Sequence, residues 1–247
     1  MFPPLREILV TGAAALLFAA MFLVGDRLNP LRALVRDRRG AISFGAGMSA
    51  AYVFVHVMPE LHSARGAFAA SASIPLRYEG MAIYFLALVG FLVFYGLDHL
   101  LARLRETGDP GGDRTALRLH VGGFAAYVGL MAYLLVDSLE RTTGSTALYT
   151  LAISTHFLSL DHHLREEHGA AYDRAGRFLL AGMSVSGWLV GVLLPLPRGV
   201  LALLVAFISG AIIMNNSIME LPSGKDGRFL PFMAGGLLYG LLLLPLG

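Results

Sequence analysis

Cysteine is absent from the 247 residues, and charged residues are scarce. Without thiolates, the chain can form neither disulfides nor the Cys-ligated zinc sites of many small domains. Asp, Glu, Lys and Arg make up only 15% of the sequence, against about 25% in soluble domains. A water-soluble domain of ordinary composition is therefore excluded, and any metal chemistry must rest on histidine, carboxylate and hydroxyl groups.

Long apolar runs make up most of the sequence. Runs of about 20 residues, the length needed to cross a bilayer core, recur along the whole chain. We place eight such spans at residues 8–25, 41–61, 81–102, 119–140, 146–164, 176–195, 199–218 and 229–246. Because the connections are short and the alternation of barrel strands is missing, the sequence predicts an all-α membrane protein with a single polytopic domain, 1–247.

The basic residues favour one end of the predicted spans. Only five lie before span 1 or in the connections after even-numbered spans: Arg6, Arg65, Arg77, Arg141 and Arg198. The others follow spans 1, 3, 5 and 7, so the positive-inside rule places those connections in the cytoplasm and both termini outside. We expect an integral protein of a cell membrane, which in a bacterium is the inner membrane. The arginines are topology signals, and no nucleic-acid partner is expected.

Two apolar segments far apart in the chain share one pattern. A Phe, a Gly and a Pro have the same spacing in both: Phe44, Gly47 and Pro59, and Phe207, Gly210 and Pro222. Corresponding Gly/Pro-interrupted segments are typical of transporters built from repeats, although two apolar helices can also match by chance. Spans 2 and 7 run in opposite directions. We therefore predict an inverted repeat of spans 1–3 and 6–8 around spans 4 and 5, a 3+2+3 arrangement.

Ionisable residues inside the spans are the functional candidates, because a charged side chain at membrane depth is energetically expensive. In span 5, His156 and His163 are seven residues apart and share a helical face that Glu167 continues. Imidazole and carboxylate groups suit a transition metal such as zinc. Alternatively, residues 161–168 are only a solvated helix end, with Asp161 paired to Arg165.

Further candidates flank this stripe. In span 4, Asp137 is expected to face His156, or to make a structural hydrogen bond with a nearby Ser or Thr. At the end of span 5, a cluster of exchangeable ligands is predicted to act as a metal release station: His162, His163, Glu166, Glu167 and His168. His56 and Glu60, at the end of span 2, are the next candidates as metal ligands.

The motifs of spans 2 and 7 resemble those of a known family. Residues Gly47 to Glu60, which end in His-Val-Met-Pro-Glu, are similar to the second helix of the ZIP (Zrt/Irt-like) metal transporters. Residues Gly210 to Pro222 resemble the seventh helix of that family. The resemblance implies an elevator-type carrier of a divalent metal, with its metal site between helices 4 and 5. Only Asp137, His156 and Asp161 match the family's ligand positions there, which implies a reduced site.

Three classes of function remain open. The first is a carrier of a divalent cation such as zinc, which is not an enzyme and needs no resident cofactor. The second is an intramembrane metal-dependent hydrolase, but neither His-Glu-x-x-His nor Gly-x-Ser-x-Gly occurs. The third is a ZIP-derived sensor or partner subunit that no longer transports. The 29 glycines leave room for close helix contacts, including those of a homo-oligomer.

Overall fold

The computed structural model describes residues 4–25, 38–71, 76–106, 110–136, 143–217 and 227–244, and within these ranges the protein is all-helical. In the part of the chain that the structure describes, eight continuous helices overlap the eight predicted spans. They are α1 (Leu5–Val24), the run of α3 (Arg38–Tyr52), η2 (Val53–Val57) and α4 (Met58–Ser71), α5 (Leu76–Glu106), α6 (Pro110–Val136), α7 (Thr143–His168), η3 (Tyr172–Gly176) with α8 (Arg177–Leu193), α9 (Arg198–Asn215) and α10 (Phe229–Leu243).

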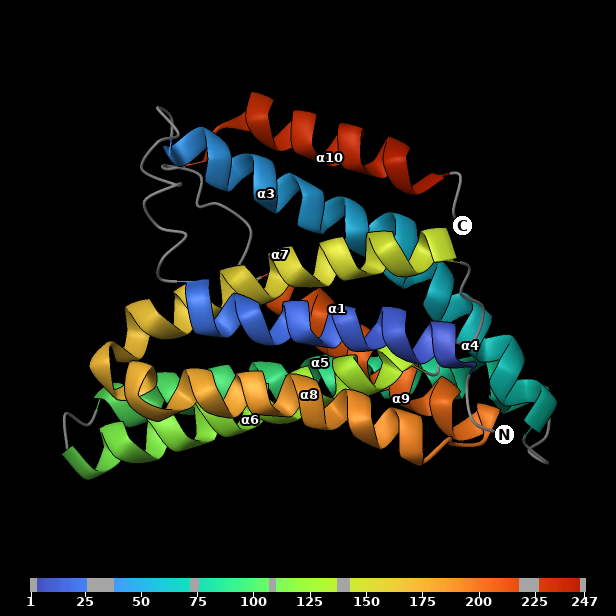
Figure 1. Cartoon of the computed structure of the whole chain (residues 1–247), viewed down its shortest axis with the longest axis horizontal. Coiled ribbons are helices and arrows are strands. Elements are labelled where there is room, and N and C mark those ends of the chain that lie inside the picture. Colours follow the sequence, from blue (N-terminus) through green and yellow to red (C-terminus); the bar gives the residue numbers. More distant parts are fainter. Residues whose placement is uncertain are drawn as a thin grey trace.

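The helices run up and down one elongated bundle. In Figure 1, α1 begins and α10 ends at the same end of the bundle, close to the labels N and C. The end of α7 and the beginning of α6 lie at the opposite end. The ends of α5 and α7 and the first turns of α6 carry arginines from the predicted basic side, so these residues gather at one end of the described bundle.

Five of the described helical segments are long and apolar enough to cross a membrane: 5–24, 81–104, 112–136, 172–193 and 198–215. The prediction of eight membrane spans is therefore confirmed only in part. Helix α10 is apolar but has 15 residues. Helix α7 is rich in hydroxyl, imidazole and carboxylate groups, and it packs on α1, α3 and α6, so part of its surface faces protein.

The helices pack as two groups. The first helix group consists of α1, α6, α7 and α8, in which the most extensive contact joins α6 to α8 and further contacts join α1 to α6, α7 and α8. The second helix group consists of α3–η2–α4, α5, α9 and α10, with its largest contacts between α3 and α10 and between α5 and α9. Contacts between the groups join α5 and α9 to α6, and α3 to α7.

Glycines bring α3 and α10 into backbone contact. A Cβ atom on Gly47 would collide with the carbonyl group of Phe232 and with the backbone nitrogen of Gly236. A Cβ atom on Gly235 would collide with the carbonyl group of Phe44. Small residues let helix backbones approach this closely, and any larger side chain would separate the two helices.

The α5–α9 pair has the same contact. A Cβ atom on Gly210 would collide with the carbonyl group of Ala87 and the backbone nitrogen of Phe91, and one on Gly90 with the carbonyl group of Phe207. The two residues of α9 in this contact are the sequence counterparts of Phe44 and Gly47 in α3. The shared Phe and Gly of the two segments therefore occupy equivalent places in two different helix pairs.

Candidate functional site

The middle of the seam between α6 and α7 holds His156. Its Nε2 atom lies 2.9 Å from the hydroxyl oxygen of Tyr127, a buried residue of α6. Two turns earlier on α7, the hydroxyl group of Tyr149 donates a hydrogen bond to the carbonyl oxygen of Met131 at 3.1 Å. Tyr127 is thus a described α6 partner of His156. Asp137, the expected partner, lies outside the described residues.

A small cavity adjoins His156 where the two helix groups meet. Its volume is about 20 Å³, which is room for about one water-sized species. Its walls come from α3, α6, α7, the end of α9 and α10, and they include six side chains with polar atoms: Ser49, Tyr52, Thr155, His156, Asn216 and Tyr239. Oxygen and nitrogen atoms in such a space can replace part of the hydration shell of a cation.

The end of α9 carries a second buried amide beside this cavity wall. Asn215 is 1% exposed, and neither atom of its side-chain amide has a hydrogen-bond partner among the described residues. A buried polar group without a partner costs about 1–3 kcal/mol. We therefore expect a water molecule or another polar group to hydrogen-bond to the side-chain amide of Asn215.

A cluster of metal-ligating side chains lies at the end of the α6–α7 seam where α6 begins and α7 ends. His120 of α6 meets His163 and Glu167 of α7, and one ligand atom from each lies within 4.8 Å of the others. Nδ1 of His120 is 3.0 Å from Oε2 of Glu167, and Nε2 of His163 is 3.4 Å from Oε1 of Glu167. Among the described residues, this is the one group of three or more His, Cys, Asp or Glu residues with such spacing.

His168 extends this cluster. Its Nε2 atom lies 3.0 Å from Nδ1 of His120 and 3.8 Å from Oε2 of Glu167. The His120 and His168 side chains are almost fully buried, at 3% and 7% exposure, whereas those of Glu167 and His163 are 21% and 33% exposed. We call these four residues the end cluster. The predicted pair of His163 and Glu167 thus comes together with a histidine of α6 that the sequence analysis did not include.

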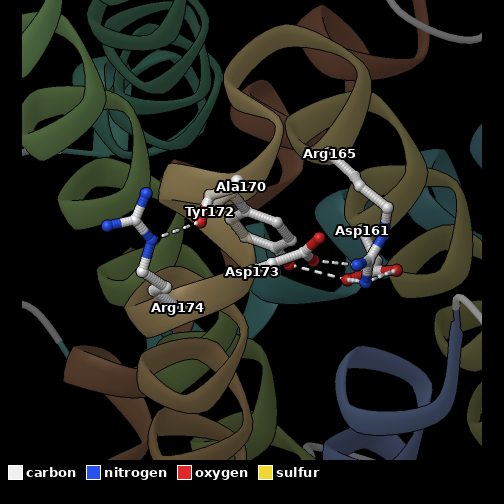
Figure 2. A network of polar contacts seen from close by, with 6 residues as sticks. All are labelled: Asp161, Arg165, Ala170, Tyr172, Asp173 and Arg174. Atoms are coloured by element: carbon white, nitrogen blue, oxygen red, sulfur yellow. Dashed lines mark hydrogen bonds and ion pairs between the residues drawn. The ribbon is translucent and has the colours of Figure 1, made fainter.

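Asp161 belongs to a separate ion-pair network, shown in Figure 2. Its carboxylate is buried and accepts hydrogen bonds from Nη2 of Arg165 at 3.0 and 3.1 Å and from the hydroxyl group of Tyr172 at 2.8 Å. Arg165 also pairs with Asp173, while Arg174 donates to the carbonyl oxygen of Ala170. Asp161 therefore has a cation and a hydroxyl donor already on its oxygens.

His162 and Glu166, also expected in the release station, form their own pair. Nε2 of His162 lies 3.0 Å from Oε1 of Glu166, whose side chain is 60% exposed. Successive residues on a helix point about 100° apart, so this pair lies on a different side of α7 from His163 and Glu167. The pair has the same two residue types at the same spacing, but the metal-ligating group that His120 joins does not include it.

His56 and Glu60 lie on the second helix group. Nε2 of His56 is 3.8 Å from Oε2 of Glu60, and the imidazole ring stacks on Tyr52 with 5.1 Å between ring centroids. His56 is part of η2, a single turn of π-helix within the long helix, and such insertions are frequent at functional sites. Tyr52 also lines the cavity beside His156, so His56 is connected to that cavity through one aromatic ring.

Two functional candidates escaped the sequence analysis, namely His120 and Tyr127. No family model matches the sequence, and no curated protein is significantly similar to it. The geometry described above therefore carries the functional argument by itself.

Proposed function

We propose that this protein is a membrane carrier for a divalent transition-metal cation, with its path at the interface of the two helix groups. The observation that carries the proposal is the small cavity between the groups, whose lining includes the polar side chains of His156 on α7 and of Asn216 at the end of α9. A space for one water-sized species suits a single ion that protein atoms contact directly. Ligand sites at the interface of helix repeats near the middle of the membrane are typical of transporters.

The glycine contacts support the 3+2+3 inverted repeat. If spans 1–3 and 6–8 are related by a two-fold axis, the α3–α10 pair corresponds to the α9–α5 pair. Gly47 and Gly210 then have equivalent neighbours, and so do Gly235 and Gly90. Chance similarity between two apolar segments would not by itself produce matching partners on α10 and α5.

The division into two helix groups favours a rigid-body mechanism. Movement of the first helix group relative to the second would expose the cavity alternately at the two ends of the bundle, which is how alternating access works in repeat-built carriers. The most extensive of the described contacts lie within the groups and not between them, which is compatible with sliding. In this proposal the ZIP-type elevator is retained, and a reduced ligand set takes the place of the family's metal site.

Binding at the cavity requires a local exchange of partners. A metal ion that takes Nε2 of His156 must displace the hydroxyl group of Tyr127, at a net cost of about 1 kcal/mol for the lost hydrogen bond. Such a modest cost keeps binding reversible, which conduction requires. Asp137 remains a proposed ligand on the α6 side, beyond the described residues.

The orientation in the membrane is part of the proposal. The end of the bundle with most arginines, which also holds the end cluster, faces the cytoplasm, and both termini face outward. In a bacterium this places the protein in the inner membrane. The end cluster would then be the last ligand set that a metal entering the cell meets.

Metal flux into proteoliposomes tests the proposal. The purified protein should accumulate at least one ion from a panel of Zn²⁺, Co²⁺, Mn²⁺, Fe²⁺ and Cd²⁺ above protein-free liposomes. H156A should lower that flux at least tenfold. H99A is the matched control, because His99 is an exposed histidine of α5 that stacks on Tyr95. Absence of flux for every ion, or equal flux in H156A and the wild type, would reject this path.

A second candidate is a metal-binding protein that does not transport. The Tyr127–His156 hydrogen bond favours it, because it ties up the imidazole that the path needs. A protein that binds metal in detergent but shows no flux in liposomes would support this sensor or partner role over the carrier.

A further inference from the structure

The end cluster differs from a row of exchangeable ligands along one helix. We propose that His120, His163, Glu167 and His168 form one four-donor metal site that fastens α6 to α7 when a metal binds. This inference concerns binding alone and stands whether or not the protein carries ions. It assigns His120 as a ligand and gives the cluster a structural effect on the bundle.

Glu167 and His120 lie at the centre of the donor set: Oε2 of Glu167 faces His120 and His168, and Oε1 of Glu167 faces His163. Nδ1 of His120 faces both Oε2 of Glu167 and Nε2 of His168, each at 3.0 Å. One proton on a ring nitrogen can be directed at only one of two such acceptors. A cation placed between the three atoms interacts favourably with the lone pairs of all of them, so the arrangement suits a metal better than a single hydrogen bond.

The spacing of the donors fits a tetrahedral ion. Zinc bonds to nitrogen and oxygen at about 2.0–2.1 Å, which places neighbouring donors of a tetrahedron about 3.3 Å apart. Nδ1 of His120 lies 3.0 Å from both Oε2 of Glu167 and Nε2 of His168, and Nε2 of His163 lies 3.4 Å from Oε1, the other oxygen of Glu167. The 3.8 Å between His168 and Glu167 makes His168 the outermost donor. Three imidazoles and one carboxylate favour Zn²⁺ or Co²⁺ over Ca²⁺ and Mg²⁺, which prefer all-oxygen sites.

The ion-pair network of Figure 2 joins residues that precede and follow two of the donors in the sequence, and we call this network the frame. Arg165 pairs with Asp173 across the turn at Gly169, and Glu167 and His168 lie between these two residues in the sequence. Gly169 has φ of 52°, in the left-handed region that favours glycine, and it reverses the chain directly after His168. Asp161 and Tyr172 anchor the same arginine and turn, so these four residues act as positioning residues for the site.

A metal bridge here would matter because α6 and α7 otherwise pack on different helices. The main partner of α6 is α8, and that of α7 is α1, whereas direct contact between α6 and α7 is sparse. An ion held by His120 on one side and by three α7 residues on the other would therefore join two pairs of helices. Metal binding should make this end of the first helix group more resistant to unfolding.

Cobalt binding by the full-length protein in detergent tests the ligand set. Wild-type protein should bind Co²⁺ with a visible ligand-field spectrum of tetrahedral type, and Zn²⁺ should displace it. H120A, H163A and E167Q should each weaken Co²⁺ binding at least tenfold, and H168A should have a smaller effect. The double variant H162A/E166Q is the matched control, because it removes the neighbouring His–Glu pair, and it should bind Co²⁺ as the wild type does.

A cysteine at position 120 provides an independent readout. Because the chain has no cysteine, a sulfur-to-cobalt charge-transfer band in H120C can arise only from residue 120. We expect that band, together with recovery of the binding that H120A loses. The band also shows that residue 120 binds the metal directly, so a loss of binding in H120A cannot then be explained by misfolding alone.

Thermal unfolding tests the bridge between the helices. Zn²⁺ should raise the Tm of the wild type and of H162A/E166Q, and this increase should vanish in H120A, although all three α7 donors are intact. The proposal is overturned if H120A binds Co²⁺ as tightly as the wild type, if H120C gives no charge-transfer band, or if Zn²⁺ stabilises H120A as much as the wild type.

Discussion

The middle and the end of the α6–α7 seam use histidine in opposite ways. In the middle, His156 is paired with the hydroxyl group of Tyr127 and borders a cavity shared with the second helix group. At the end, His120 and His163 converge with Glu167 inside the first helix group. The first arrangement offers one imidazole at a movable interface, whereas the second collects several donors within one group. Reversible passage suits the middle, and tight binding suits the end.

The largest effect is expected for the frame of the end cluster. D161A should lower the free energy of unfolding by about 3 kcal/mol, because it leaves the partly buried Arg165 with one carboxylate fewer and removes the acceptor of the buried Tyr172. Thermal unfolding in detergent with a chelator present measures this effect without metal. If D161A unfolds as the wild type does, Asp161 is not part of the frame and becomes available as a ligand.

The sharpest functional separation is expected between H156A and E167Q. H156A should lose at least tenfold in metal flux and keep its Co²⁺ affinity at the end cluster within a factor of two. E167Q should show a tenfold loss of Co²⁺ affinity, because an amide replaces the charged ligand that both His120 and His163 contact. Both measurements are made on the same two preparations. Equal losses in both assays for either variant would show that the two places form one site.

A moderate effect is expected for Y127F. Removal of the hydroxyl group frees Nε2 of His156, so the metal no longer displaces a hydrogen bond worth about 1 kcal/mol, and the apparent affinity for the transported ion should rise about fivefold. The concentration dependence of flux in proteoliposomes gives this value. Y149F is the control, since its hydroxyl group bonds to a backbone carbonyl. A weaker apparent affinity in Y127F would make the Tyr127 oxygen itself a ligand on the path.

The smallest effect is expected for D173N. The side chain of Asp173 is 40% exposed, so its pair with Arg165 is screened by water and contributes well below 1 kcal/mol to stability. Co²⁺ affinity at the end cluster should fall about threefold, because the turn that carries Glu167 and His168 becomes less restricted. Co²⁺ titrations of D173N and D161A, carried out side by side, compare the two carboxylates that pair with Arg165. A larger loss of Co²⁺ affinity in D173N than in D161A would make Asp173 the more important of the two.

The sequence was sufficient to predict the helices because hydrophobic length is a local property. All eight spans overlap continuous helices, and His163 and Glu167 come together because a spacing of four residues places them on one face. Their partner His120 lies 43 positions before His163, on another helix. In two antiparallel helices with a short connection, residues that are equally far from the connection lie side by side. This rule places His120 near His163 and Tyr127 near His156.

Other features could not be predicted from local patterns. The pair of Asp161 with Arg165, one of the two alternatives that the sequence offered, is confirmed, but the burial of Asp161 and its third partner Tyr172, which follows the turn at Gly169, have no local signal. Hydropathy alone also does not show that α7 packs against other helices. Because part of its surface faces protein, α7 can carry polar side chains that a lipid-facing helix could not. The inverted repeat, the route of the ion and the pairing of Asp137 with His156 stay predictions.

The glycine contact between α3 and α10 has a consequence for the order of biogenesis. These two helices lie near opposite ends of the chain, yet each presents to the other a backbone surface that larger side chains would block. At a synthesis rate of about 5–20 residues per second, α3 waits roughly 10–40 s for α10 to leave the ribosome. During that interval the glycine face of α3 is without its α10 partner. Truncation before Phe229 should therefore leave this face permanently without its partner and shorten the lifetime of the chain in the cell.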